Sequence, residues 1–358
     1  MHGNCKGAFL SDTDTTNLVE GDILGGKGTF DDASYWTAGS SWTVSGGVAT
    51  ATSGSNSYLQ KNGILTTGAR YVIRITVSSY STGTLYVYCG TGAPGLQNHY
   101  FGVSANGTYT MVLDAYNTNF GLYSTGFAGV VDDVTVSSVV DQDRSVNGKD
   151  LGVIGTVTRS AVATGADLVA YSGFTDDDYL TQPYNSSLDF GTGDYYMSIW
   201  AKGGGDSQCL MIREHGTADN DGALLLFQSG GKYNFYSRQN GTAGWSSFAA
   251  TTAAYGDYWS HVVMVRTGGT LYGYVNGEPQ GSTSFAGDVS NNDAKIYIGR
   301  RNPTVDNSQE YSGSLALARI GGSAPSAEQI KKMYNDEKML FQENAKCTLY
   351  GSSDAVTT

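Results

Sequence analysis

Short alternations of apolar and polar residues run through residues 25–140 and predict strands rather than helices. In the segment 70–77 every second residue is apolar, namely Tyr71, Ile73, Ile75 and Val77. A period of two is typical of an antiparallel strand with one buried face. Glycine-containing pairs at 46–47, 82–83 and 106–107 separate such segments and predict turns. This region is therefore predicted to form one β-sandwich.

A different pattern marks residues 171–323. The apolar runs at 224–227 and 262–265 are continuous, which is typical of strands covered on both faces. Asn276 and Gly277 supply the left-handed residues that a two-residue hairpin needs. These features predict a second sandwich with a sheet-on-sheet core.

After Pro325 the apolar pattern takes the period of a helix. Ser326 and Gln329 have the spacing of a capping box, so a helix is expected to begin near Ala327. Its apolar stripe contains Ile330, Met333, Tyr334 and Phe341. We expect this stripe to dock on its own sandwich or on a sister subunit.

The predicted fold class is all-β, with two antiparallel β-sandwich (jelly-roll) domains in series and a short C-terminal α-helix. The expected divisions are a docking segment 1–24, a sandwich 25–140, a linker 141–170, a sandwich 171–323, and a helix and tail 324–358. The stretch 141–170 also contains strand-like pieces, so it is either a linker or a strand of one of its neighbours.

Composition supports this picture and excludes some functions. The 358 residues include 49 Gly, 25 Tyr and only 5 Pro, which suits short strands joined by tight turns. The net charge of -12 repels phosphate backbones and anionic lipids, so nucleic-acid binding is not expected. No apolar run reaches the ~20 residues of a membrane span, and no signal peptide is recognisable, so neither membrane insertion nor ordinary secretion is expected.

The cysteines are few and far apart in the sequence. They form no CxxC pair, and we expect them to be buried single thiols, as in a protein made in a reducing cytoplasm, at Cys5, Cys89, Cys209 and Cys347.

Two resemblances add to this interpretation. The segments GTFDDASYW, WTVSGGVATAT, YVIRITV and GVVDDVTVSSV resemble carbohydrate-binding modules of the galactose-binding-like jelly-roll type. The segments FTDDDYLTQPYNSSLDFGTGDYYMSIWAKGG, YGDYWSHVVMVRTGGTLYGYVNGEP and KIYIGRRN with EYSGSLALARIGGSAPSAEQIKKMY resemble the laminin-G-like branch of the concanavalin A-like lectins and glucanases. The second resemblance is the more specific one, because its three signatures occur in the order and spacing of the family.

A third resemblance concerns the setting. LVAYSGF, TQPYNSSLDFG and FQENAKCTLYGSSDAV are similar to segments of marine tailed-phage structural proteins that carry this lectin-like domain. Those proteins generally continue further, which is consistent with a fragment or a processed product. The resemblance implies a virion protein that is made in the host cytoplasm and reaches the virion surface without a secretion signal.

The superfamily includes glycoside hydrolases, so an enzyme is one function that the resemblance allows. A retaining glycosidase needs two carboxylates about 5 Å apart, and no strand has acids at alternate positions in the required pattern. The acid clusters at 132–133 and 176–178 are consecutive instead, and the histidines are isolated. The chain is therefore expected not to be an enzyme.

Calcium is the cofactor that both resemblances imply, although the sequence does not require one. In the first domain Asp132 and Asp133, with carbonyls from 25–31, are the candidate ligands. In the second domain the candidates are Asp177 and Asp178, but the closing strand has Ser314, Ala316 and Ala318 where relatives have aspartates. Turn-capping aspartates are the alternative interpretation at both places.

Sugar binding would use aromatic faces together with planar polar groups. The candidates in the first domain are Trp36, Trp42, Tyr58, Tyr100 and Tyr116. Those in the second are Trp245, Tyr255, Arg300, Arg301 and Asn302. Each aromatic residue has core or rim packing as its alternative role, and Trp200 and Trp259 are expected to be core.

The favoured hypothesis is a non-enzymatic surface protein of a tailed-phage virion, such as a tail fibre, an appendage or a capsid decoration. Its expected partners are host cell-surface glycans, other virion proteins and copies of itself, with a trimer favoured because such fibres usually trimerise. The alternatives are a purely structural virion protein, a secreted bacterial carbohydrate-binding adhesin, and a glycosidase reduced to its accessory modules.

Overall fold

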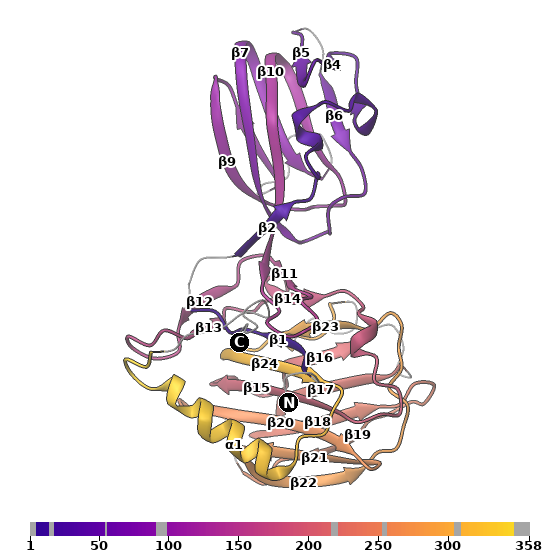
Figure 1. Cartoon of the computed structure of the whole chain (residues 1–358), viewed down its shortest axis with the longest axis vertical. Coiled ribbons are helices and arrows are strands. Elements are labelled where there is room, and N and C mark those ends of the chain that lie inside the picture. Colours follow the sequence, from indigo (N-terminus) through magenta and orange to yellow (C-terminus); the bar gives the residue numbers. More distant parts are fainter. Residues whose placement is uncertain are drawn as a thin grey trace, which may run out of the picture. The chain divides into compact units, whose positions relative to one another are not determined.

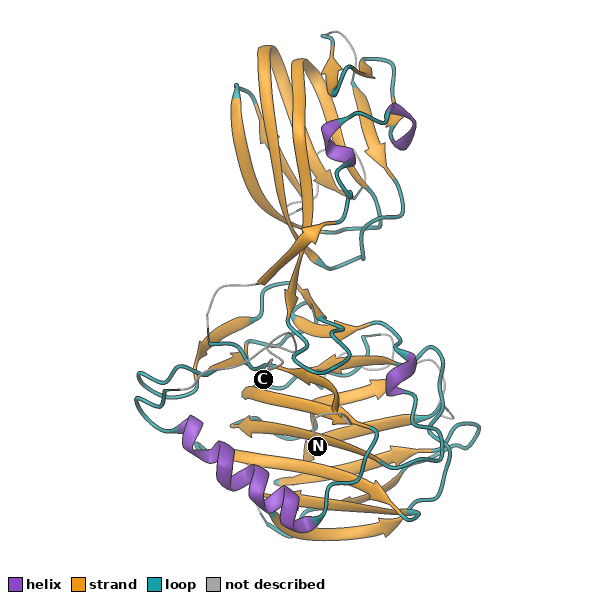
Figure 2. Cartoon of the chain, viewed as in Figure 1, coloured by secondary structure: helices purple, strands orange, loops and turns teal. Residues whose placement is uncertain are grey.

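A computed structural model describes residues 5–13, 18–53, 56–90, 99–215, 221–252, 256–303 and 309–346. Strands dominate these residues, and α1 is the α-helix among them (Figure 2). The chain divides into two compact units, 18–140 and 1–17 with 141–358. The all-β class with antiparallel sheets and a C-terminal helix is confirmed.

The unit 18–140, here called the first sandwich, is built around two long strands, β7 and β10 (Figure 1). Its strands are β2 (Leu18–Asp22), β3 (Thr37–Ala38), β4 (Trp42–Ser45), β5 (Val48–Ala51), β6 (Ser57–Lys61), β7 (Arg70–Cys89), β8 (Tyr100–Val103), β9 (Gly107–Asp114) and β10 (Phe120–Asp141). Short 3-10 turns, η2 (Lys27–Thr29) and η3 (Ala33–Tyr35), follow β2.

Both long strands contribute to two layers. The second half of β7 and the first half of β10 form one layer with β3, β6 and β8. The other halves form the second layer with β4, β5 and β9. Between the layers lie fully buried side chains, among them Leu59, Leu85, Leu122, Ile73, Ile75 and Val136.

The prediction of a turn at 82–83 is wrong. The structure keeps Thr82 and Gly83 inside β7, where the chain bends between the two layers instead of reversing. Gly83 has φ 75°, and a Cβ there would lie 2.2 Å from the backbone of Gly126. The close approach of β10 therefore explains the glycine.

The other unit, here called the second sandwich, contains two sheets. One has the order β12-β13-β24-β15-β20-β21-β22, with β1 added to β24. The other has the order β19-β18-β17-β16-β23-β14-β11. Their strands are β1 (Cys5–Phe9), β11 (Leu151–Ile154), β12 (Thr158–Ala161), β13 (Val169–Ser172), β14 (Tyr179–Gln182), β15 (Tyr195–Lys202), β16 (Gln208–Glu214), β17 (Ala223–Ser229), β18 (Lys232–Arg238), β19 (Ser246–Ala249), β20 (Trp259–Thr267), β21 (Thr270–Val275), β22 (Glu278–Ser284), β23 (Lys295–Ile298) and β24 (Ser314–Gly321).

Two of the expected divisions differ from this arrangement. Residues 141–170, expected as a linker, contribute β11, β12 and the start of β13, because their apolar residues are buried in the second sandwich. Within 1–24, expected as a docking segment, β1 pairs with β24 through partners such as Phe9 and Ala318. The first sandwich is therefore inserted within the sequence of the second.

The C-terminal helix follows the sequence expectation. Helix α1 (Ala327–Glu337) begins after Ser326, and the capping box with Gln329 is present. The 3-10 turn η5 (Lys338–Phe341) continues it. Ile330 is fully buried against a cluster of sheet residues, Tyr196, Val263 and Val265, so the helix docks on its own sandwich. Among the described residues no helix is long and apolar enough to cross a membrane.

Candidate functional site

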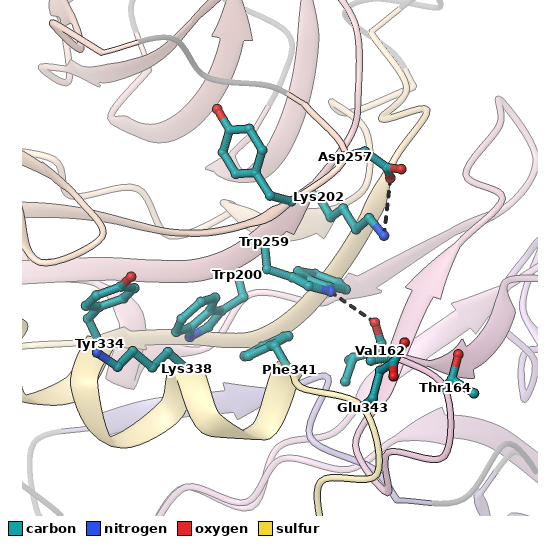
Figure 3. Close-up of a pocket in the computed structure, with 12 residues that line it drawn as sticks. Val162, Thr164, Trp200, Lys202, Asp257, Trp259, Tyr334, Lys338, Phe341 and Glu343 are labelled. Atoms are coloured by element: carbon teal, nitrogen blue, oxygen red, sulfur yellow. Dashed lines mark hydrogen bonds and ion pairs between the residues drawn. The ribbon is translucent and has the colours of Figure 1, made fainter.

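A groove of about 440 Å³ opens on the second sandwich beside the end of the helical segment (Figure 3). We call it the aromatic groove. Its lining residues are Val162, Ala163, Thr164, Trp200, Lys202, Asp257, Tyr258, Trp259, Tyr334, Lys338, Phe341 and Glu343. They come from β15, the start of β20 and the two residues before it, α1, η5 and the segment after it, and the loop between β12 and β13.

The strand register places the aromatic floor of this groove. Lys202 is the direct partner of Trp259 on β20, and Trp200 is the partner of His261. Direct partners on antiparallel strands share one face, here the face that the helix partly covers. The groove lies where α1 and η5 end and leave this sheet face open.

The aromatic rings of the floor are fixed by stacking. Phe341 lies over Trp200 with ring centroids 4.2 Å apart, and its centroid is 4.8 Å from that of Trp259. The indole N–H of Trp259 donates to the carbonyl of Val162 at 3.1 Å. Trp200 is buried, whereas Trp259 is half-buried and Tyr258 is 51% exposed. The groove thus presents rigid rings with accessible surface.

Charged groups form the rim. Lys202 makes an ion pair of 3.2 Å with Asp257, whose side chain is 99% exposed. Lys338 and Glu343, both exposed, lie on the helical side. Both signs of charge are present, so the rim offers hydrogen-bond donors and acceptors rather than a uniform field. Aromatic faces with mixed polar groups suit a ligand that has both C–H faces and hydroxyls.

Beneath the floor a polar network holds Trp200 in place. Its indole N–H donates to Glu337 at 2.7 Å, and Arg319 donates to the same carboxylate at 2.6 Å. His261 stacks on Trp200, and burial lowers the pKa of this histidine to about 4. Its Nε2 lies 3.0 Å from the hydroxyl of Ser198, and neither residue has exposed surface to meet a substrate.

The far wall is closed by the segment after η5. The N–H of Asn344 donates to the carbonyl of Thr164 at 2.8 Å, and the N–H of Asp167 donates to that of Ala345 at 2.9 Å. Gly165 has φ 70°, and a Cβ there would lie 2.3 Å from the Asn344 side chain. The left-handed backbone favours glycine here, and a larger residue would also displace the Asn344 side chain.

The sequence-predicted residues of the first sandwich fall into two groups. Trp36 and Trp42 are buried and donate their indole N–H groups to the carbonyls of Lys27 and Ser57. Tyr58 and Tyr116 are 41% and 49% exposed, and Tyr100 is half-buried. Burial leaves little of the two tryptophan faces for a ligand, while the tyrosines are reachable.

In the second sandwich Arg300, Arg301 and Asn302 belong to an internal polar network. The guanidinium of Arg301 pairs with buried Glu214 at 2.8 Å, and the backbone N–H of Asn302 donates to the same carboxylate at 3.2 Å. Arg300 is 1% exposed. These contacts organise the loop after β23, and only Arg301 keeps appreciable exposure.

Trp245 lies outside the aromatic groove. It packs edge-on against Tyr236 and beneath the guanidinium of Arg238, whose carbon is 4.6 Å from the ring centroid. The remaining candidate, Tyr255, falls outside the described residues.

The residues proposed for calcium do not fit such a site through their side chains. Asp178 accepts hydrogen bonds from the N–H of Thr156 and the hydroxyl of Thr175, so it closes a loop; Asp177 is exposed. Asp132 accepts from the N–H of Asp133 at a bulge. The described residues contain no group of three potential metal-ligating side chains, whereas calcium takes six to eight oxygens.

Sequence reasoning missed the aromatic groove because it assigned Trp259 to the core. Trp200 is indeed core, but Trp259 lies at the start of β20, where the sheet face is open. The only available signal was the pair Tyr258-Trp259 after an exposed aspartate, since strand ends carry exposed aromatic residues more readily than strand centres.

The second sandwich, with its two antiparallel sheets, has a fold of the concanavalin A-like type. Residues 174–331 match the family model described as the concanavalin A-like lectin/glucanases superfamily. The laminin-G-like resemblance of the second sandwich is thereby confirmed. A comparison with curated proteins gave no match.

Solved structures with related folds include binding domains. Domain 4 of AbnA, an extracellular arabinanase from Geobacillus stearothermophilus, in complex with arabinotriose, is 17% identical with a TM-score of 0.44, covering 54% of this chain and 92% of that chain. The binding domain of Paraclostridial Mosquitocidal Protein 1 is 16% identical with a TM-score of 0.44, covering 55% of this chain and 49% of that one. The botulinum neurotoxin serotype D binding domain is 19% identical with a TM-score of 0.42, covering 55% and 49%. The chain thus spans about half the length of the two toxin domains, and likeness at this level says nothing about its ligand.

Proposed function

We propose that this chain is a non-enzymatic glycan-binding protein whose second sandwich holds a carbohydrate in the aromatic groove. The observation that carries the proposal is the combination of the fixed, half-buried ring of Trp259 and the exposed ring of Tyr258 with a mixed-charge rim. Tyr258 and Trp259 offer faces for the C–H side of a sugar, and the Lys202–Asp257 pair offers donors and acceptors for its hydroxyls.

The proposal includes no hydrolysis. Asp257 and Glu343 are the acids that line the groove, and both are exposed. A general acid of a glycosidase needs an environment that raises its pKa, usually an apolar pocket. Hydrolysis of a bound polysaccharide would overturn this part of the proposal.

The proposed setting is the surface of a tailed-phage virion, where the protein would recognise host glycans during attachment. Support comes from the sequence segments similar to phage structural proteins. Other virion proteins and further copies of this chain, as a trimer, are the proposed neighbours. Proteomics of purified particles together with light scattering of the free protein tests the setting; a monomer that is absent from particles would contradict it.

A glycan array tests the binding itself. We expect the full chain to bind a host envelope polysaccharide and Tyr258→Ala to bind it about tenfold more weakly, the size of effect that removing one stacked ring produces. Asp257→Asn should weaken binding less, because a neutral amide still accepts a hydrogen bond.

The matched control is Tyr184→Ala, which removes a tyrosine that is 38% exposed and does not line the groove. It should bind as the wild type does. Equal binding by Tyr258→Ala and the wild type would exclude the groove as the site. Absence of binding to every envelope glycan would favour a purely structural role.

A further inference from the structure

The strand register of the first sandwich collects tyrosines on one sheet face. Tyr123 on β10 is the direct partner of Tyr58 on β6 and also of Tyr86 on β7. Direct partners lie on the same side of an antiparallel sheet, so the three rings are neighbours across three strands. Adjacent Leu59 and Leu122 point into the core, which places the tyrosines on the outer side.

A second row of partners lies beside the first. Gln60, Gly121, Tyr88 and Tyr100 are aligned across β6, β10, β7 and β8. A Cβ on Gly121 would lie 2.5 Å from the ring of Tyr88, so the hydroxyl end of this ring lies over the glycine. The hydroxyl of Tyr88 then donates to the side chain of Gln60 at 2.9 Å. The ring of Tyr100 stands edge-on to that of Tyr86, with centroids 5.5 Å apart.

We call these residues the tyrosine face: Tyr58, Gln60, Tyr86, Tyr88, Tyr100, Gly121 and Tyr123. The face carries no charged side chain, although the chain as a whole has a net charge of -12. Among the described residues, no hydrogen bond joins the hydroxyls of Tyr58, Tyr86 and Tyr123 to the protein. Tyr58 is 41% exposed, and Tyr86, Tyr100 and Tyr123 are half-buried. Tyr88 is only 2% exposed, so it packs between its neighbours and supports the face rather than contacting a ligand.

We propose that the tyrosine face is a second binding site and that it takes an uncharged polysaccharide laid across the strands. Three rings at the strand spacing span about 10 Å, enough for a short run of sugar residues. Ring faces suit sugar C–H surfaces, and unpaired phenolic hydroxyls suit sugar hydroxyls. The absence of charge matches a neutral polysaccharide better than an acidic one, because no lysine or arginine of the face is available to pair with carboxylates.

The inference shares its ligand class with the proposed function but not its site, so the two can fail separately. Affinity electrophoresis of the full chain in gels that contain galactomannan, laminarin or arabinan is the test, with alginate as an acidic comparator. We expect a neutral polysaccharide to retard the wild type, with Tyr58→Ala and Tyr123→Ala each weakening this retention about tenfold. Alginate should retard it less.

Tyr184→Ala in the second sandwich and Tyr116→Ala, an exposed tyrosine outside the face, are the controls, and Tyr258→Ala separates the groove from the tyrosine face. Both controls should retain the interaction of the tyrosine face. Because Tyr123 is half-buried, Tyr58→Phe and Tyr123→Phe accompany the alanine variants; they keep the rings and should retain most of the affinity. If retention is lost only in Tyr258→Ala, this inference is wrong and the proposal that the aromatic groove binds the polysaccharide is supported. No retention of any form, or a change only in oligomeric state upon Tyr58→Ala, would overturn it as well.

Discussion

The two sandwiches differ in what they bury. In the first, the buried polar side chains among the described residues are serines, Ser41, Ser57 and Ser124. In the second, buried polar residues include arginines, carboxylates and a histidine, with Glu214, Arg213, Asp141 and His261 among them. Apolar burial therefore holds the first sandwich together, whereas the second also depends on internal ion pairs.

This difference determines where ligand-binding groups remain available. Arg300, Arg301 and Asn302 of the second sandwich satisfy buried partners and are largely withdrawn from the surface. In the first sandwich Tyr58, Tyr86 and Tyr123 have no such partners among the described residues and keep exposed surface on one sheet face. The second sandwich instead makes its candidate site from several distant segments around a groove.

The largest effect is expected from breaking the internal ion pair of the second sandwich. Glu214→Ala leaves Arg301 and the N–H of Asn302 without their carboxylate, and removal of one partner of a buried pair costs about 3–5 kcal/mol. Urea denaturation should show this loss. Arg70 of the first sandwich forms a partly exposed ion pair with Asp114, so Arg70→Ala should lower the free energy of unfolding much less. An equal loss in both variants would contradict the difference between the two sandwiches.

The next effect concerns pH. The hydroxyl of Tyr171 has one hydrogen but contacts two carboxylates, Asp12 at 2.7 Å and Asp141. Burial and the charge of Asp12 raise the pKa of Asp141 from 3.8 to about 7. Between pH 3.8 and about 7 the folded chain holds a proton on Asp141 that the unfolded chain releases. The contribution of Asp141 to the stability of the fold is therefore fully present below about pH 4. That stability is lost as pH rises through about 7, by up to about 1.4 kcal/mol per pH unit.

The measurement is the free energy of unfolding of the wild type and Asp141→Asn between pH 4 and 8. The amide resembles the protonated carboxyl, so the difference between the two proteins should vary with pH in the predicted direction. Arg159, which donates to Asp12 at 2.9 Å, and Arg144, 3.4 Å from it, partly offset the carboxylate charges. A difference that is constant with pH would show that the two carboxylates share no proton.

A smaller effect is expected in the first sandwich from Gly121→Ala. The new methyl group meets the ring of Tyr88 at 2.5 Å, and overpacking of this kind costs about 1–3 kcal/mol. The retention of Gly121→Ala by neutral polysaccharides should also be lower than that of the wild type, because the new methyl group displaces the Tyr88 ring from its position in the tyrosine face. Gly152→Ala on β11, where the nearest atom is 3.6 Å away, is the matched control and should leave retention unchanged.

The smallest effect is expected at α1, the helix that packs on the second sandwich. Ser326→Ala removes the side-chain cap of α1 and should cost about 1 kcal/mol. Glycan binding in the aromatic groove should also become slightly weaker, because Tyr334 and Phe341 line the groove and lie on this helical segment. Lys332→Ala, which removes an exposed pair with Asp336, should cost less than about 0.5 kcal/mol in the same melting experiment.

Local patterns predicted most elements of the fold, because their signals lie within a few residues. The hairpin at Asn276 and Gly277, with φ of 53° and 78°, and the cap at Ser326 are examples. Long-range partners were not predictable in this way. Nothing in the sequence near Cys5–Phe9 identifies β24 as its partner, and nothing near Gly83 distinguishes a bend from a hairpin.

The candidate sites, too, could be predicted only in part, because they depend on long-range strand pairing. Tyr58 and Tyr100 could be named from their sequence surroundings, but their grouping with Tyr86 and Tyr123 depends on the register of four strands. Trp36 and Trp42 looked equally suitable and are buried. Exposure and register are properties of packing, so an aromatic residue in a strand cannot be assigned from pattern alone.

The pairing of β1 with β24 also matters while the chain is being made. The thiol of Cys5 and its contact at Ile320 are 315 residues apart. At ribosomal rates of about 5–20 residues per second, the first strand therefore waits roughly 15–60 seconds for its partner. The first sandwich is complete in sequence well before then and is free to fold. Until β24 emerges, an unpaired β1 edge is exposed to other nascent chains, which is a hazard for aggregation.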